Sequence, residues 1–160
     1  MRARVSIFRR GRRAVACALA WTASASAAPL DFELATLGGE WLQLSRLPPA
    51  VTVVNFWRSD CPPCRRELPL LRDLESRRPD VRVVAVALQG RNETETYAQS
   101  VDLPRLLMIG PTVPAALLRR FGDPAGALPH TVVLDDNREP CSARTGEVDS
   151  RWLEQAIEAC

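Results

Sequence analysis

Two cysteines separated by two prolines, Cys61-Pro62-Pro63-Cys64, constrain this chain more than any other feature of its sequence. They come just after the apolar run Val51–Trp57, which is typical of a strand covered on both faces of a sheet. A helix is predicted over residues 64–77, where leucines recur at helical spacing. The pair therefore lies at a helix N-terminus, where the helix dipole and unpaired N–H groups favour a thiolate. Because a thiolate is the species that attacks a disulfide, the pattern predicts a redox dithiol.

Two other interpretations of the cysteine pair are a structural disulfide and half of a zinc site. Zinc takes about four protein ligands in such sites. The remaining candidates are Cys141, Cys160 and His130, and they show no second C-x-x-C or H-x-x-x-H spacing. The chain has a single histidine, so we expect no metal site.

The N-terminal segment has the three parts of a bacterial secretory signal peptide. Six arginines and no acidic residue precede an apolar run at residues 14–21, and small residues follow at 23–28. The sequence predicts a signal peptide over residues 1–27, cleaved after Ala27, and one domain over residues 28–160 in the periplasm. The apolar run is shorter than the ~20 residues of a membrane-spanning helix, although an uncleaved anchor is the alternative.

Cleavage would change both the charge and the cysteine count. The six arginines leave with the signal, so 15 arginines face 19 acidic residues in the domain. That balance offers no basic patch for nucleic acid, and we expect no nucleic-acid partner. Four cysteines remain, an even number that permits two disulfides in an oxidising compartment. The natural pairing is Cys61–Cys64 as the catalytic pair and Cys141–Cys160 as a structural disulfide, with two unpaired thiols as the alternative for the second pair.

The domain alternates predicted strands and helices, which indicates an α/β fold. A β-hairpin is expected around Gly38-Gly39, and Asn92 is expected to cap a short polar helix. Pro69 is expected to kink the helix that follows the cysteines. Further strands are predicted over residues 81–88, 106–109 and 130–135, and further helices over 92–100, 114–121 and from 149 or 150 to the C-terminus.

Several motifs lie in one order along the chain: Phe32 and Leu34, the Gly38-Gly39 turn, Leu44-Ser45, Val54-Asn55-Phe56-Trp57, Cys61, Pro63-Cys64, Glu67, Pro69, Gly122, and Leu128-Pro129 ahead of Thr131–Asp135. In this set the chain resembles the periplasmic TlpA/ResA/DsbE-like family of thiol:disulfide oxidoreductases. The resemblance covers nearly all of residues 28–160. It implies a thioredoxin-like fold, a central mixed sheet flanked by helices, with an N-terminal β-hairpin extension.

The resemblance also implies roles for residues. Cys61 would attack, Cys64 would resolve the mixed disulfide, and Pro129 would be a cis-proline that presents Leu128 to the client. Trp57, Asp60, Pro62 and Pro63 would support the site. The expected partners are a client protein with a disulfide or thiols and a membrane electron-donor thiol protein, with no cofactor and a monomeric enzyme.

The expected activity is disulfide reduction of the kind used in cytochrome c maturation or metal-centre assembly. Two alternatives remain. One is a metallochaperone-like module that binds Cu(I) through the two cysteines, which are soft ligands. The other is a dithiol oxidase.

The chain departs from the family pattern at three positions. Asp60 replaces a tryptophan, Arg58 replaces an alanine, and His130 stands where threonine is usual. A carboxylate beside Cys61 disfavours its thiolate, whereas nearby arginines favour it, and the sequence does not decide between them. We expect His130 to be an ordinary strand residue, Glu67 to lie on the helix surface, and Trp57 to pack beneath the cysteines.

Overall fold

A seven-stranded mixed sheet runs through the molecule in the order β2-β1-β5-β4-β3-β6-β7. The computed structural model describes residues 28–160, so the predicted signal peptide lies outside the described residues. The strands are β1 (Glu33–Thr36), β2 (Trp41–Gln43), β3 (Thr52–Trp57), β4 (Arg82–Ala87), β5 (Leu106–Ile109), β6 (His130–Leu134) and β7 (Pro140–Thr145). The helices are α1 (Pro62–Arg77), α2 (Arg91–Ala98), α3 (Ala115–Arg120) and α4 (Ser150–Glu158). Within this part of the chain, no helix is both long and apolar enough to cross a bilayer.

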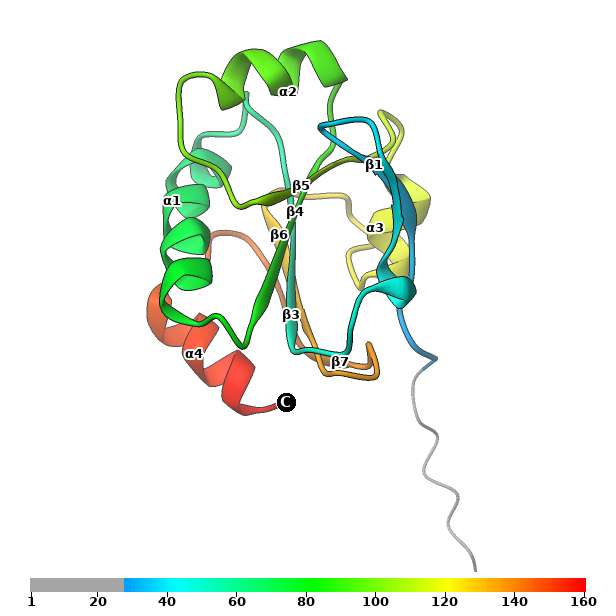
Figure 1. The fold of residues 1–160 in the computed structure, drawn as a ribbon, viewed down its shortest axis with the longest axis vertical. Coiled ribbons are helices and arrows are strands. Elements are labelled where there is room, and N and C mark those ends of the chain that lie inside the picture. The colour runs from blue at the N-terminus through cyan, green and yellow to red at the C-terminus, as the bar shows by residue number, and fades with distance from the viewer. Residues whose placement is uncertain (1–27) are drawn as a thin grey trace, which may run out of the picture.

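Strand β3 is buried on both faces, as its unbroken apolar sequence predicts. It pairs parallel with β4 and antiparallel with β6. Val54 and Phe56 pack with the leucines of α3, whereas Val53 packs with residues of α1 and α4. Figure 1 shows the same division, with α1 and α4 on one side of the sheet and α3 on the other. The strand therefore carries the cysteine loop out of a fixed, two-sided core.

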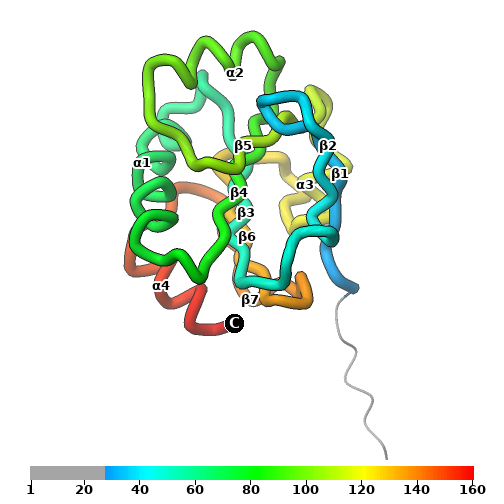
Figure 2. The backbone as a smooth tube through the Cα atoms, in the orientation of Figure 1, coloured from blue at the N-terminus to red at the C-terminus, as the bar shows by residue number. Residues whose placement is uncertain are grey.

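The predicted β-hairpin is confirmed as β1 and β2, which pair antiparallel. Gly39 lies in the turn with φ +99, a left-handed conformation that glycine adopts at little cost. Strand β1 also pairs with β5, which makes the hairpin part of the main sheet. Phe32 precedes β1 and contacts Phe121 with ring centroids 5.7 Å apart, so the hairpin also packs beside α3 (Figure 2).

Helix boundaries agree with the sequence in places and differ in others. Asp149 caps α4 by accepting a hydrogen bond from the Trp152 amide at 2.8 Å. The expected cap at Asn92 is wrong, because α2 begins at Arg91 after Gly90, with no side-chain cap. Helix α1 runs through Pro69 without interruption from Pro62 to Arg77.

A disulfide joins Cys141 in β7 to Cys160, which comes just after Ala159, the C-cap of α4. Strand pairing places it away from the cysteine loop, because Leu134 of β6 pairs with Pro140 whereas His130 pairs with Thr145. The two sulfurs close a loop over a sequence separation of 19. The bond therefore holds the last helix against the edge strand.

Replacing Cys141 and Cys160 together by serine is expected to lower the free energy of unfolding by roughly 2 kcal/mol. Restoring this loop's freedom to the unfolded chain is worth ~3 kcal/mol in the chain-entropy treatment, and residual structure reduces that figure. Urea unfolding of the oxidised proteins measures the loss. The single Cys160→Ser variant, which also lacks the bond, should lose a similar amount, and a double variant as stable as the wild type would contradict the expectation.

Candidate active site

Cys61 and Cys64 form a disulfide at the start of α1. Cys61 is the N-cap residue, and its sulfur accepts a hydrogen bond from the Cys64 amide at 3.3 Å. Pro62 and Pro63 occupy the first helical positions, where a missing N–H costs little because that group has no partner within the helix. The two sulfurs differ in access, since Cys61 is half-buried and Cys64 is 1% exposed.

The loop that ends in Pro129 lies at the same edge of the sheet. Phe56 near the end of β3 pairs with His130 at the start of β6, so the segments after Trp57 and before His130 emerge together. The Leu128–Pro129 peptide bond is cis, and the Pro129 carbonyl accepts a hydrogen bond from the Gly146 amide at 2.8 Å. Leu128 and Cys61 pack against the same buried cluster. The loop that carries Leu128 and the loop that carries Cys61 are therefore anchored on one buried cluster.

Trp57 forms the floor beneath the cysteines. It is completely buried in a cluster with Cys64 and Leu68. Its ring also contacts Tyr97 of α2, with centroids 5.5 Å apart. The indole thus fills the space under the start of α1, where it fixes the position of the helix against the end of β3.

Glu67 is buried, with 1% of its surface exposed, so the expectation of a surface residue is wrong. It stands three residues after Cys64 and four before Leu71, and this spacing places it on the inner face of α1. The same spacing was visible in the sequence, where it should have outweighed the preference of glutamate for solvent. Sequence reasoning therefore missed that Glu67 belongs to the site.

A small polar network surrounds the Glu67 carboxyl. The Thr131 hydroxyl donates to its Oε1 at 2.8 Å, and the Asn55 side-chain amide donates to the Thr131 hydroxyl at 2.9 Å. Oε2 has no hydrogen-bond partner. Burial raises the pKa of the Glu67 carboxyl from 4.5 to about 7, and the hydrogen bond from Thr131 opposes this increase only in part. The site therefore contains a buried carboxyl, one helical turn from Cys64, that can gain or lose a proton near neutral pH.

Two interactions hold the segment between β3 and Cys61. Arg58 and Asp60 form a two-pronged ion pair, with nitrogen–oxygen distances of 2.8 and 3.0 Å. This hydrogen bonding lowers the pKa of the Asp60 carboxyl. The Ser59 amide donates to the side-chain oxygen of buried Gln89 at 2.6 Å. Asp60 stands where the family has a tryptophan, and Arg58 stands where it has an alanine. The positive charge of Arg58 thus offsets the negative charge of Asp60.

His130 is buried and uses both ring nitrogens within the fold. Nε2 lies 2.8 Å from the Phe121 carbonyl and Nδ1 lies 2.9 Å from the Thr145 hydroxyl. Because a carbonyl only accepts, Nε2 carries the hydrogen. The ring also stacks on Phe56, with centroids 6.1 Å apart. His130 is therefore a packed strand residue, as expected from the sequence.

The fold and the dithiol together define a thioredoxin-fold thiol:disulfide oxidoreductase. The sequence profile of the redoxin family matches residues 23–150, and the chain belongs to that family. It is similar to the thiol-disulfide oxidoreductase ResA of Halalkalibacterium halodurans, with 26% identity over 133 residues, covering 81% of this chain and 73% of the relative. It is also similar to the thioredoxin-like protein YneN of Bacillus subtilis, with 28% identity over 137 residues, covering 80% of this chain and 75% of the relative.

Solved structures support the same fold. The crystal structure of a putative thiol:disulfide interchange protein DsbE from Chlorobium tepidum superposes with a TM-score of 0.73 at 24% identity, covering 84% of this chain and 95% of that one. The family resemblance and the fold class predicted from the sequence are therefore confirmed.

Proposed function

We propose that this chain is an exported reductase of client disulfides, with Cys61 as the attacking thiol and Cys64 as the resolving thiol. The difference in access between the two sulfurs carries the proposal. Cys61 is half-buried at the helix N-cap, whereas Cys64 is 1% exposed behind it. A client disulfide can approach the first sulfur from solvent, and the second sulfur is then held within reach of the first.

The reaction transfers two electrons in two exchange steps. The Cys61 thiolate attacks one sulfur of the client disulfide, forms a mixed disulfide and expels the other client sulfur as a thiolate. Cys64 then loses its proton and attacks the Cys61 sulfur. This step breaks the mixed disulfide, releases the second client thiolate and forms the Cys61–Cys64 disulfide. A membrane electron-donor thiol protein restores the dithiol by the reverse exchange.

Glu67 is the proposed proton acceptor for Cys64. A buried thiol needs a base, because burial in apolar surroundings disfavours its thiolate. The Glu67 carboxyl lies one helical turn from Cys64, and burial raises its pKa to about 7. A base with that pKa can both take the proton and return it near neutral pH.

The remaining site residues have supporting roles in the proposal. Leu128 and Pro129 bind the extended client chain beside Cys61, as in strand-addition recognition. Trp57, Asp60, Pro62 and Pro63 hold the cysteine loop in place. Cys141 and Cys160 form a structural disulfide that takes no part in electron transfer.

The reductive direction, and clients of the cytochrome c maturation or metal-centre assembly type, rest on the family resemblance. Residues 1–27 act as the signal peptide and residues 28–160 as the periplasmic domain, which N-terminal sequencing of the exported protein tests. A monomer fits the surface, because Trp41 and Val113 are the large hydrophobic side chains exposed within the described residues. Size-exclusion chromatography tests this state.

The reduction potential of the Cys61–Cys64 couple tests the direction of electron flow. A reductase is expected to have a potential near −270 mV, the value of thioredoxin, whereas a strong oxidant such as DsbA lies near −120 mV. Equilibration in dithiothreitol redox buffers, followed by thiol alkylation and mass spectrometry, gives the value. A potential at the oxidising end would exclude the reductive proposal and favour the dithiol oxidase.

A further inference from the structure

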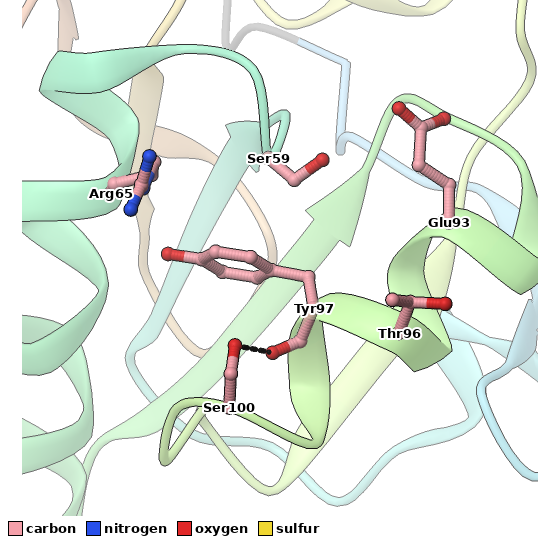
Figure 3. Close-up of a pocket in the computed structure, with 6 residues that line it drawn as sticks. All are labelled: Ser59, Arg65, Glu93, Thr96, Tyr97 and Ser100. Carbon is pink, nitrogen blue, oxygen red and sulfur yellow. Dashed lines mark hydrogen bonds between the residues drawn. The ribbon is translucent and has the colours of Figure 1, made fainter.

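A groove of about 450 Å³ lies beside the cysteine loop, between the start of α1 and helix α2. Figure 3 shows the six residues that line it: Ser59, Arg65, Glu93, Thr96, Tyr97 and Ser100. Tyr97 forms the floor, since its ring packs on the buried Trp57 at 5.5 Å. The Arg65 guanidinium stands 5.8 Å from the centre of the same ring. The groove is therefore built on the aromatic pair that also supports the active site.

Arg65 differs from the two other arginines near the cysteines. Arg58 pairs with Asp60, and Arg66 pairs with Glu147 at 2.6 Å. Within residues 28–160, Arg65 makes no ion pair, and its aromatic contact leaves the guanidinium edge with its N–H donors for another group. Of these three arginines next to the cysteines in sequence, Arg65 is thus the one whose charge no ion pair within the described residues offsets.

Opposite charge marks the other wall of the groove. Glu93, in the first turn of α2, is exposed and makes no ion pair within the described residues. Figure 3 shows Arg65 and Glu93 on either side of Tyr97. The groove therefore has a basic end on α1 and an acidic end on α2, with an aromatic floor between them.

We propose that this groove binds the client segment next to the reacting cysteine, with an acidic client side chain on Arg65. The inference rests on the proposed function. Ser59 lines the groove and stands two residues before Cys61, so the groove adjoins the loop that carries the sulfur a client disulfide approaches. A guanidinium binds a carboxylate through two parallel hydrogen bonds, and tyrosine and arginine are frequent anchors at binding surfaces.

Peptide disulfides test the proposal. Two seven-residue peptides have a central cysteine flanked two and three residues away on both sides by aspartate in one and lysine in the other. Their symmetric disulfides are mixed with the reduced protein, and the released peptide thiol is measured after acid quenching. Each rate is divided by that variant's rate with bis(2-hydroxyethyl) disulfide, which is uncharged and too small to span the groove. Dividing by this rate corrects for any effect of the substitution on the reactivity of the Cys61 thiolate.

Arg65→Gln is expected to lower the normalised rate for the acidic peptide about threefold relative to the basic peptide, as for an exposed ion pair. Arg65→Glu, which adds repulsion, is expected to lower it about tenfold. Arg66→Gln is the matched control: it removes a neighbouring charge that Glu147 already offsets, and it should change the ratio less than about 1.5-fold. The effect of Arg65 should weaken at 1 M salt, where exposed charges are screened.

The outcomes separate this inference from the proposed function. If the wild type reduces bis(2-hydroxyethyl) disulfide but the Arg65 variants keep the wild-type peptide ratio, the groove proposal is overturned and the function stands. If Arg66→Gln changes the ratio as much as Arg65→Gln, the effect belongs to general charge and the groove proposal also fails. If the wild type reduces none of the disulfides, the proposed function falls and the groove proposal falls with it.

Discussion

Replacing Cys61 by serine is expected to lower the rate of insulin disulfide reduction by at least about a thousandfold, to the uncatalysed background. Cys61 is the more accessible sulfur at the start of α1, and its partner Cys64 is almost fully buried. A serine hydroxyl cannot form the mixed disulfide, and Cys64 is too enclosed to replace the missing thiolate. Turbidity of insulin in dithiothreitol measures the rate.

Cys64→Ser is the control that separates attack from resolution. This variant keeps the Cys61 thiol, which is the more accessible of the two, so it should form a mixed disulfide with a client and then stop. Non-reducing mass spectrometry should find one client chain per protein with Cys64→Ser and none with Cys61→Ser. Turnover by Cys61→Ser at the wild-type rate, or the reverse order of trapping, would show that the roles of the two thiols are assigned wrongly.

Much of the fold could be predicted from short-range patterns. The apolar run before the cysteines gave β3, because a strand covered on both faces needs no alternation. Glycine marked the hairpin turn, where Gly39 has a positive φ. The order of strands in the sheet was not contained in these patterns, since pairing of β1 with β5 joins segments that are far apart in sequence. The family resemblance supplied the fold class that local patterns left open.

The candidate site shows the same difference between local patterns and contacts that join distant segments. The cysteine pair was evident because its motif is local. The environment of Glu67 was not, because it depends on Asn55 and Thr131, which come from two other elements and meet the carboxyl only in the folded protein. Gln89 was missed for a similar reason, since its hydrogen bond to Ser59 spans 30 residues. The sequence therefore located the cysteine pair at the start of α1, but it did not predict the buried residues that surround this pair.

The buried Glu67 carboxyl is expected to make the oxidised protein less stable as the pH rises through 7. Its pKa is about 7 in the folded protein against an ordinary 4.5, so between these values the folded state holds a proton that the unfolded state has lost. The contribution of Glu67 to stability is complete below pH 4.5 and disappears as the pH rises through 7. The shift corresponds to a loss of about 3 kcal/mol.

Glu67→Gln isolates this effect, because glutamine keeps an oxygen that can accept from Thr131 and has no proton to lose. Urea unfolding between pH 4.5 and pH 8 should show the variant gaining about 3 kcal/mol relative to the wild type as the pH rises. Glu147→Gln is the matched control: Arg66 lowers the pKa of the Glu147 carboxyl below its ordinary 4.5, so the contribution of Glu147 is lost only at pH values below this range, and the variant should keep a nearly constant difference from the wild type between pH 4.5 and pH 8. If wild type and Glu67→Gln keep a constant difference across this range, Glu67 does not change its protonation near neutral pH, and it cannot be the base that serves Cys64.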